Sequence, residues 1–398
     1  MEFPIYLDNN STTPLDPDVL DSMMPYLTTK FGNAASKSHK YGWETEEAVE
    51  LSRKKIAQLI NAEQKEIIFT SGATESNNLA LKGVVERYAS KGNHIITSPT
   101  EHKAILDPCA YLEMHGIEVT YLKVDEYGAI DPGDLKKAIK DKTVLVSLMF
   151  ANNEIGTLNH VKEIGKVCRE HGVLFHTDGT QAVGKIPVDV DEMKIDLMSF
   201  SAHKIYGLKG IGALYIRSRK PRVSLIEQIN GGGHEKGMRS GTLNVPGIVG
   251  FGKACEICFG VMEEESKKIM LLRDKMMNAF LENIDYCYLN GHPDKRIPNN
   301  LNMSFRFIDS EALMMEMKEL AISSGSACTS ATLETSYVIK AIGKSEEFAR
   351  SSIRFGVGRF NTSEEIDFAI DRVIDAVKKL RKLSPAYEIF LDDNKLNN

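Results

Sequence analysis

The sequence has no apolar run long enough to cross a membrane. The longest runs, such as Val144–Ala151, fall well short of the ~20 residues that a transmembrane helix needs. The first residues lack the basic and apolar segments of a secretory signal. No charge of one sign dominates either, because 49 basic residues face 55 acidic ones and the net charge is only -6. We therefore expect neither a membrane nor a nucleic acid as a partner.

Cysteine is scarce, with six residues among 398, which excludes a disulfide-stabilised scaffold and predicts a reducing, cytoplasmic setting. Cys255 and Cys258 form a Cys-x-x-Cys pair. No second such pair or His pair accompanies it, and it lies in the helix-like stretch Val249–Met262. We expect these two thiols to face a core and predict no metal site.

The pattern of the first 220 residues favours an α/β fold with a doubly wound, mainly parallel sheet. Short β-branched runs alternate with amphipathic segments, which is typical of strand–helix–strand units. The predicted strands are 66–70, 94–97, 118–122, 144–150, 173–178, 197–201 and 213–217. The predicted helices between them are 74–88, 104–114, 132–140 and 162–171. Ligands of such sheets bind beyond the carboxyl ends of the strands, so chemistry is expected there.

A chain of this length exceeds one ordinary core, so we expect a second, smaller domain. A long helical stretch, 245–283, leads into it. Strands at 300–305 and 352–355 and helices at 310–320 and 363–383 follow, and the N-terminal residues are expected to pack there too. The polar tail after Pro385 is predicted to be mobile.

Two strand ends carry candidate binding groups. The turn and helix start at Thr70–Asn78 offer free backbone N–H groups and a helix dipole to a phosphate. Asp178 ends a buried strand, where a carboxylate needs a partner such as a protonated ring nitrogen of a cofactor. An ordinary helix cap remains the alternative at both places.

Two further positions carry candidate reactive groups. Lys204 lies in a turn between two apolar strands, where partial desolvation lowers an amine pKa toward that of a Schiff-base lysine. Its neighbour Lys209 is flanked by glycine and is expected to be exposed. Cys328 lies in a loop of small polar residues, Ser323–Ala331, where a thiol can be exposed and reactive. The other five cysteines are in helix-like or strand-like contexts and are expected to be inert.

The glycine-rich stretches do not support other cofactors. Gly207–Gly212 has the wrong glycine order for a dinucleotide fingerprint and does not open a helix. Gly231–Glu235 is followed by no zinc-binding His-Glu-x-x-His pattern.

Taken together, these residues resemble the class V branch of fold-type I pyridoxal-phosphate enzymes, and closely the IscS/NifS-type cysteine desulfurases. The similarity runs from Ile5 to about Tyr387. The motifs that carry it occur in family order and are 70–76, 100–103, 152–156, 176–181, 201–204, 238–242 and 323–330. The resemblance implies a large cofactor-binding domain at 15–255 and a small domain formed by 1–14 and 256–398.

The resemblance also implies a role for each matching residue. Lys204 would carry pyridoxal 5'-phosphate and remove the substrate Cα proton, while His102 would stack on the ring and handle protons. Asp178 would pair with the ring nitrogen and Gln181 with the ring hydroxyl. Asn153 and Arg354 would bind the substrate carboxylate, and Cys328 would take the sulfur of L-cysteine as a persulfide, leaving alanine. The implied phosphate ligands are Ala73, Thr74, Ser201 and His203, with Thr242 from the partner subunit of a homodimer.

The sequence leaves three alternatives open: a selenocysteine lyase, a class V aminotransferase and a scaffold without activity. An aminotransferase has no need of Cys328, and a scaffold has no reason to keep Lys204, Asp178 and Arg354. The implied partners are an iron–sulfur scaffold protein and other sulfur acceptors. The chain departs from relatives at Asn9–Ser11, a minor matter, and in its polar tail. Only Tyr387, Phe390 and Leu391 could anchor a scaffold there, unless the tail packs on its own domain.

Overall fold

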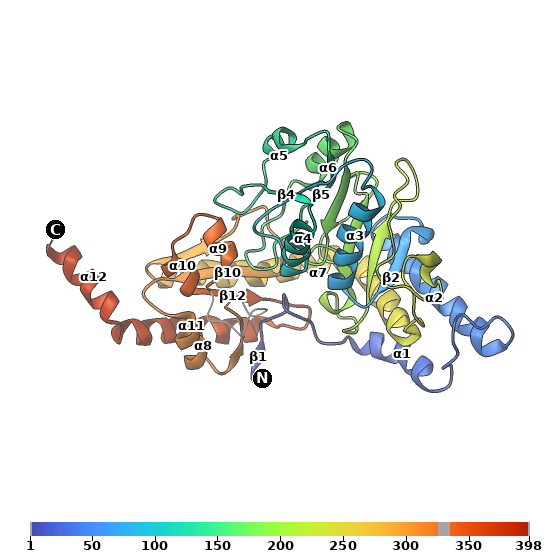
Figure 1. Ribbon diagram of the computed structural model, residues 1–398. Helices are drawn as coiled ribbons and strands as arrows, with labels where there is room; N and C mark the ends of the chain where they lie inside the picture. The colour runs from blue at the N-terminus through green and yellow to red at the C-terminus, as the bar shows by residue number, and fades with distance from the viewer. Residues whose placement is uncertain (1, 325–334, 397–398) are drawn as a thin grey trace.

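The structure is a computed structural model that describes residues 2–324 and 335–396. Its largest element is a seven-stranded sheet in the order β2-β8-β7-β6-β5-β3-β4 (Figure 1). Strands β7, β6, β5, β3 and β4 run parallel, whereas β8 is antiparallel to both of its neighbours. The strands are β2 (Ile67–Thr70), β3 (His94–Thr97), β4 (Glu118–Tyr121), β5 (Thr143–Ser147), β6 (Leu174–Asp178), β7 (Leu197–Ser201) and β8 (Gly212–Ile216). The predicted α/β fold and mainly parallel sheet are confirmed.

Helices cover both faces of this sheet, as the doubly wound prediction requires. One apolar core joins the sheet to α3 and α4, and another joins its opposite face to α1, α2, α6 and the first half of α7. The central strands are buried along their whole length, because helices cover both faces of the sheet. The helices are α1 (Pro17–Thr28), α2 (Lys40–Leu59), α3 (Ala73–Arg87), α4 (Lys103–Met114), α5 (Pro132–Ala138), α6 (Val161–Glu170) and α7 (Val245–Asn283). Short 3-10 turns lie at η1 (Gln64–Glu66), η2 (Ala202–Lys204) and η3 (Glu235–Gly237).

A third core lies at the other end of the chain's long helix, α7. It packs the second half of α7 against α8, α11 and a three-stranded antiparallel sheet of order β12-β10-β9. The N-terminal strand β1 (Ile5–Tyr6) pairs with β11 (Leu320–Ala321), so the expectation that the N-terminus packs there is confirmed. The remaining elements are β9 (Cys287–Asn290), β10 (Asn300–Phe305), β12 (Ser352–Gly356), α8 (Ser310–Glu316), α9 (Tyr337–Ala341), α10 (Glu346–Arg350), α11 (Ser363–Lys382) and α12 (Pro385–Leu396). Because α7 runs through both cores, a domain boundary near residue 255 stays a proposal.

Helix α7 is the one described helix long and apolar enough to cross a membrane by length and composition. Half of its apolar window (50%) is buried inside the protein, against α1 and α2. Cys255 and Cys258 lie on this buried face, which confirms the prediction of core-facing thiols. Among the residues described, no group of three or more His, Cys, Asp or Glu side chains could hold a metal ion.

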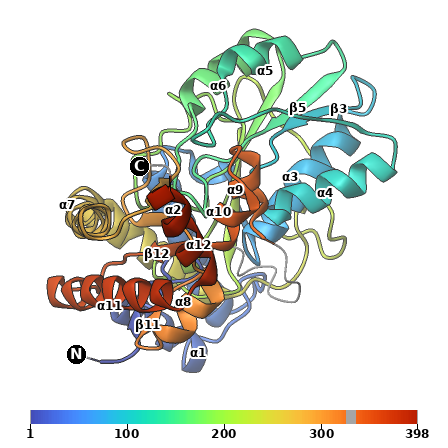
Figure 2. The ribbon, with the colours of Figure 1, turned by 90° about the vertical axis from the view of Figure 1, so that its left-hand side faces the viewer.

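The chain beyond Pro385 forms helix α12, whereas the sequence predicted a mobile tail. This helix projects away from the body at the end of α11 (Figures 1 and 2). Aromatic contacts hold its first turns, because the ring of Phe390 lies 4.7 Å from that of Phe307 and 5.1 Å from that of Tyr286. Tyr387 lies 5.4 Å from the Phe307 ring. No local pattern in the sequence indicates that these rings meet, since they are far apart along the chain.

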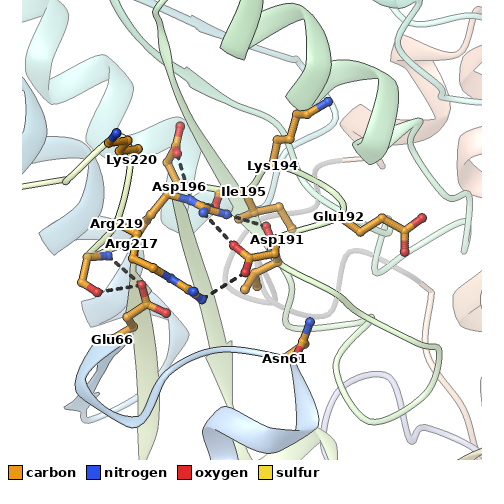
Figure 3. Close-up of polar contacts among 12 residues, drawn as sticks. Asn61, Glu66, Asp191, Glu192, Lys194, Ile195, Asp196, Arg217, Arg219 and Lys220 are labelled. Atoms are coloured by element: carbon orange, nitrogen blue, oxygen red, sulfur yellow. Dashed lines mark hydrogen bonds and ion pairs between the residues drawn. The ribbon is translucent and has the colours of Figure 1, made fainter.

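The amino ends of β6 and β7 are tied together by a charge network (Figure 3). The buried carboxylate of Asp196 accepts hydrogen bonds from Arg169 (2.6 Å) and from the Phe175 amide (3.1 Å), and it lies 3.4 Å from Arg217. Arg217 also pairs with Asp191 at 2.7 Å. Burial raises the pKa of Asp196 to about 6, although both arginines oppose that shift. The charges at the amino ends of these strands are thus paired with one another, and the candidate site lies at the carboxyl ends.

Candidate active site at the carboxyl ends of the strands

A cavity of about 520 Å³ lies at the carboxyl ends of the parallel strands. Its volume is within the range of roughly 300–1,000 Å³ that is typical of small-molecule sites. Asp178 and Ser201 line it from the last positions of β6 and β7. His102 reaches it after β3 and Asn153 after β5. The cavity thus lies beyond the carboxyl ends of the strands, where a ligand was expected.

All but two of the predicted site residues line this cavity. The residues that line it are Ala73, Thr74, His102, Asn153, Asp178, Gln181, Ser201, His203, Lys204 and Arg354. Thr242 is exposed and does not line it, and Cys328 lies outside the described residues. Segments that are far apart in the sequence thus meet around one space.

Lys204 ends the short turn η2 that follows β7, and its side chain is half-buried. Its Nζ donates a hydrogen bond to the backbone oxygen of Asn10 at 2.6 Å and another to that of Ser11. Lys209 is exposed, as predicted, although it also reaches the rim of the cavity. Lys204 is therefore the amine that the fold holds within the cavity wall.

The carboxylate of Asp178 is buried and held at both oxygens. Asn77 from α3 donates to Oδ2 at 2.8 Å, and the backbone amide of Thr180 donates to Oδ1 at 3.0 Å. The Thr180 contact is local and belongs to a turn; no helix starts between β6 and β7, so the alternative that Asp178 caps a helix is wrong. The Asn77 contact comes from another helix and fixes the carboxylate plane at the floor of the cavity.

Two histidines of the site carry defined hydrogen bonds. His102 caps helix α4, where its Nδ1 accepts from the Ala104 amide at 3.1 Å, so its Nε2 is the protonated ring nitrogen of the neutral form. The Nδ1 of His203 lies 3.1 Å from Thr12 Oγ1. Burial, followed by the charge of Lys204, lowers the pKa of His203 to about 4. His203 is therefore neutral at physiological pH.

The N-terminus of α3 forms one wall of the cavity. Its cap is Gly72, which has no side chain to satisfy the first amides and adopts φ 155°. A Cβ atom at Gly72 would lie 3.8 Å from Ser201 Oγ, so the turn lies directly against the end of β7. Ala73 and Thr74 line the cavity from the first turn of this 15-residue helix. Such a helix start binds anions through free N–H groups and its dipole.

Arg354 from β12 is buried at the opposite wall. Its guanidinium donates to Asp8 at 2.9 Å, to Ser11 Oγ at 2.6 Å and to the Asn153 carbonyl at 3.0 Å. The residues Asn10, Ser11 and Thr12 also line the cavity, and the sequence analysis had treated this stretch as a minor matter. The pairing of β1 with β11, the bridge from Asp8 to Gly356 and the hydrogen bond from the Thr13 amide to the His203 carbonyl bring it there.

Several polar atoms around the cavity have no partner among the described residues. They are Asn10 Oδ1, Thr180 Oγ1 and Arg354 Nε, and all three are buried. Buried polar groups in proteins are almost always hydrogen-bonded. The cavity is thus suited to a ligand with several polar groups, at least one of them anionic.

Two buried carboxyls near the site were not anticipated. Burial raises the pKa of Glu101 to about 8 and that of Glu154 to about 7. Glu154 accepts a hydrogen bond from Ser336, the cap of α9, and Tyr337 donates to the Glu101 carbonyl at 2.7 Å. These contacts attach the start of α9 to the two segments that carry Asn153 and His102.

The five cysteines within the described residues are all buried and free. Burial raises the pKa of the Cys109 and Cys287 thiols to about 12 and that of Cys258 to about 11, and it also raises those of Cys168 and Cys255. A thiol must ionise to react. The prediction that these five are inert packing residues is therefore confirmed for their burial and their thiol pKa.

The sequence profile of the family Aminotransferase class-V matches residues 5–368. Among curated proteins, the chain is 54% identical over 397 residues to "Cysteine desulfurase IscS" of Anaeromyxobacter dehalogenans (strain 2CP-C), covering 100% of this chain and 98% of that one. It is 55% identical over 386 residues to the protein of the same name from Rickettsia felis, covering 97% and 94%.

Solved structures have the same architecture. A "NIFS-LIKE PROTEIN" superposes with a TM-score of 0.88 at 36% identity, covering 94% of this chain and 99% of the other. "SspA in complex with cysteine" superposes with a TM-score of 0.79 at 35% identity, covering 90% and 99%.

Proposed function

Because the chain belongs to the Aminotransferase class-V family and, within it, to the IscS-type cysteine desulfurases, we propose that the cavity binds pyridoxal 5'-phosphate and releases the sulfur of L-cysteine. The enzyme converts L-cysteine to L-alanine. The observation that carries the assignment of the cavity is that a half-buried lysine, a buried aspartate and a buried arginine line one space at the strand ends. When bound, the cofactor supplies an electron sink for the bonds at the substrate Cα.

The cavity offers a complementary group for each part of the cofactor. The start of α3 with Ala73 and Thr74, together with Ser201 and neutral His203, is suited to the phosphate. The buried carboxylate of Asp178 would pair with the ring nitrogen and keep it protonated. The remaining ring contacts are assigned to His102, which would stack, and to Gln181, which would bond the hydroxyl.

The amine of Lys204 is assigned two tasks, namely covalent attachment of the cofactor and removal of the substrate Cα proton. Its hydrogen bonds to the backbone carbonyls of Asn10 and Ser11 hold the amine in the cavity wall. Arg354 and Asn153 would hold the substrate carboxylate. The hydrogen bond from Arg354 to the Asn153 carbonyl keeps the two side by side.

Cys328 is assigned the role of sulfur acceptor. Its thiol would attack the substrate sulfur, so that the S–S bond of a persulfide forms as the C–S bond breaks and a proton completes the methyl group of alanine. The substrate carbon is reduced and the sulfur oxidised, so no other redox partner is needed. The burial of the other five cysteines supports this choice, because their thiols do not ionise readily.

Incubation with L-cysteine, with alanine and sulfide both measured in the presence of a thiol reductant, tests the proposed function. Equal yields of the two products are expected. Amino-group transfer to an added 2-oxo acid without sulfide would instead identify an aminotransferase, and turnover confined to selenocysteine would identify a lyase. A purified protein without cofactor absorbance would indicate that this chain is a scaffold subunit without enzymatic activity.

We propose that the protein is a homodimer that assembles through α1, α2 and the segment between them. Large apolar side chains of this region are exposed in the single chain, more than a monomer ordinarily leaves in one place. They are Leu20, Met24, Leu27, Phe31, Tyr41, Trp43 and Leu51. Thr242 is exposed as well, on a loop held by the ion pair of Arg239 with Glu75 at 2.8 Å. It is therefore available to the phosphate site of a partner subunit.

Mixing two inactive variants tests this sharing of residues. Thr242→Ala chains and Lys204→Ala chains are each expected to be impaired, whereas a heterodimer regains one intact site of its two. With random exchange, about half of the dimers are mixed, so activity should rise to roughly a quarter of the wild-type value. Subunit exchange is verified by native mass spectrometry. Verified exchange without recovery would contradict shared sites.

The physiological sulfur acceptors are proposed to be an iron–sulfur scaffold protein and other acceptor proteins, in a reducing, cytoplasmic setting. The free cysteines of the described chain suit such a setting. In the tail, Tyr387 and Phe390 already pack on Tyr286 and Phe307, which leaves Leu391 as the exposed member of the three candidate anchors. We therefore propose that scaffold docking relies on the surface around the Cys328 loop more than on the tail.

Deleting Asp392–Asn398 is expected to leave both desulfurase activity and scaffold affinity within about twofold of wild type, because the aromatic anchors of α12 precede the deletion. Kinetics and isothermal titration with an iron–sulfur scaffold protein measure the two effects. A loss of affinity of tenfold or more, about 1.4 kcal/mol, would identify the polar tail itself as the docking element.

A further inference from the structure

A second lysine, Lys185, lies directly behind the wall of the active-site cavity. It follows β6 by seven positions, and its side chain is buried, which is rare for a lysine. Its Nζ donates a hydrogen bond to Oε1 of Gln181 at 2.8 Å. Across the described part of the chain, no carboxylate lies within ion-pair distance of this amine. Glu265 lines the same small internal cavity, but it pairs with Arg359 at 2.6 Å.

The contact places Lys185 at one end of a chain of hydrogen bonds that reaches Lys204. Gln181 Oε1 accepts from Lys185 and from Asn10 Nδ2, the latter at 3.3 Å. Gln181 Nε2 donates one of its two hydrogens to the Asn10 carbonyl at 2.9 Å. That same carbonyl accepts from Lys204 Nζ at 2.6 Å. The amide of Gln181 is therefore held by its oxygen and by one N–H, which leaves the second N–H for the cavity.

The surroundings disfavour a charge on Lys185. Burial, then the charge of Lys204, lowers its pKa to about 7, and Arg354 contributes in the same direction while Cys258 opposes it. Tyr206 and Glu265 complete the titratable groups around the small cavity. An apolar side chain of the same length would avoid this cost of burying an amine. The hydrogen bond to Gln181 is the feature that only a donor such as lysine provides.

We infer that Lys185 is a positioning residue of the active site, whose amine fixes the Gln181 amide so that an N–H, and not the oxygen, faces the ring hydroxyl of the cofactor. This inference rests on the proposed function, because it takes Gln181 as the partner of that hydroxyl. A donor at this position stabilises the ionised form of the ring hydroxyl. Losing Lys185 frees the amide to rotate and removes that stabilisation.

The test is Lys185→Met in the cofactor-loaded enzyme, in wild-type and Gln181→Ala backgrounds. The visible absorbance of the bound cofactor is titrated against pH, alongside kcat and KM for L-cysteine. In the wild-type background we expect the titration midpoint to shift by at least about half a pH unit. We also expect kcat to fall about fivefold to tenfold, the size of one lost hydrogen bond, with KM little changed. In the Gln181→Ala background, where Lys204 still carries the cofactor, Lys185→Met should add no further shift.

Lys267→Met, an exposed lysine of α7, is the matched control and should change neither readout. Lys185→Gln keeps a hydrogen-bond donor, so its titration midpoint should lie between those of wild type and Lys185→Met. It also replaces Lys185→Met in the comparison of the two backgrounds if Lys185→Met does not fold. An equal shift in both backgrounds, or no shift in the wild-type background, would overturn the inference. Failure of the proposed function is seen separately, because wild-type enzyme would then form no alanine.

Discussion

Lys204→Ala is expected to abolish the covalent link between the protein and its cofactor and to reduce desulfurase activity by at least ~1,000-fold. The expected loss has two sources, since the amine is proposed both to carry the cofactor and to remove the substrate proton, and proton transfer alone is worth roughly 10²–10⁴ in rate. The half-buried position at the end of β7, among backbone carbonyls, is the structural basis of this expectation. The measurement is borohydride reduction followed by mass spectrometry of the digested protein.

Lys209→Ala is the matched control, because this lysine lies five residues on and reaches only the exposed rim of the cavity. It should keep the reducible adduct on Lys204. Finding the adduct on Lys209 in the wild-type protein would show that the assignment of Lys204 is wrong.

The second large effect is expected at Cys328. Cys328→Ala should bring sulfide release down to background while leaving cofactor content and the spectral response to L-cysteine intact. The thiol is assigned a step after substrate binding, so binding is not expected to depend on it. The loss should be on the order of 10³-fold or more, as for removal of a nucleophile that the other groups cannot replace. Methylene-blue detection of sulfide and absorbance spectroscopy measure the two properties.

Cys168→Ala provides the comparison for Cys328→Ala. The Cys168 thiol is buried in α6 and does not line the cavity, so the turnover of this variant should stay close to wild type. Persulfide trapping after one turnover should label Cys328. A persulfide on another cysteine, with Cys328 unlabelled, would disprove the role.

Much of the fold could be predicted because its signals are local. The strand Thr143–Ser147 has the apolar centre Val-Leu-Val, and α11 has a capping box at Thr362 with an apolar stripe behind it. The antiparallel insertion of β8 between β2 and β7 has no such signal, because strand direction depends on the path of the chain between the strands. Helix α12 was missed for a similar reason, since its aromatic contacts with Phe307 and Tyr286 are made between distant segments.

The residues of the candidate site also fall into two groups: those that a local sequence pattern indicates and those that only the folded structure brings to the cavity. Asp178 and Lys204 were singled out because they end or follow a recognisable strand, and Thr74 because it opens a helix, whereas Ser201 came from the family resemblance. The wall formed by Asn10, Ser11 and Thr12 was not found, because nothing in those residues indicates what they face. Lys185 was missed as well, since its burial and its contact with Gln181 are invisible in a one-dimensional pattern.

The sequence by itself thus determined the α/β class, the end of the sheet where the candidate cavity lies and the residue types available there, because strand periodicity and strand-end motifs are properties of neighbouring residues. Only the tertiary structure decided which distant residues share a hydrogen bond. Asp8 with Arg354, Asn77 with Asp178 and Lys185 with Gln181 are examples. The physical reason is that burial and hydrogen-bond partners, which set a side chain's charge and orientation, arise from packing between elements and not from the order of residues within them.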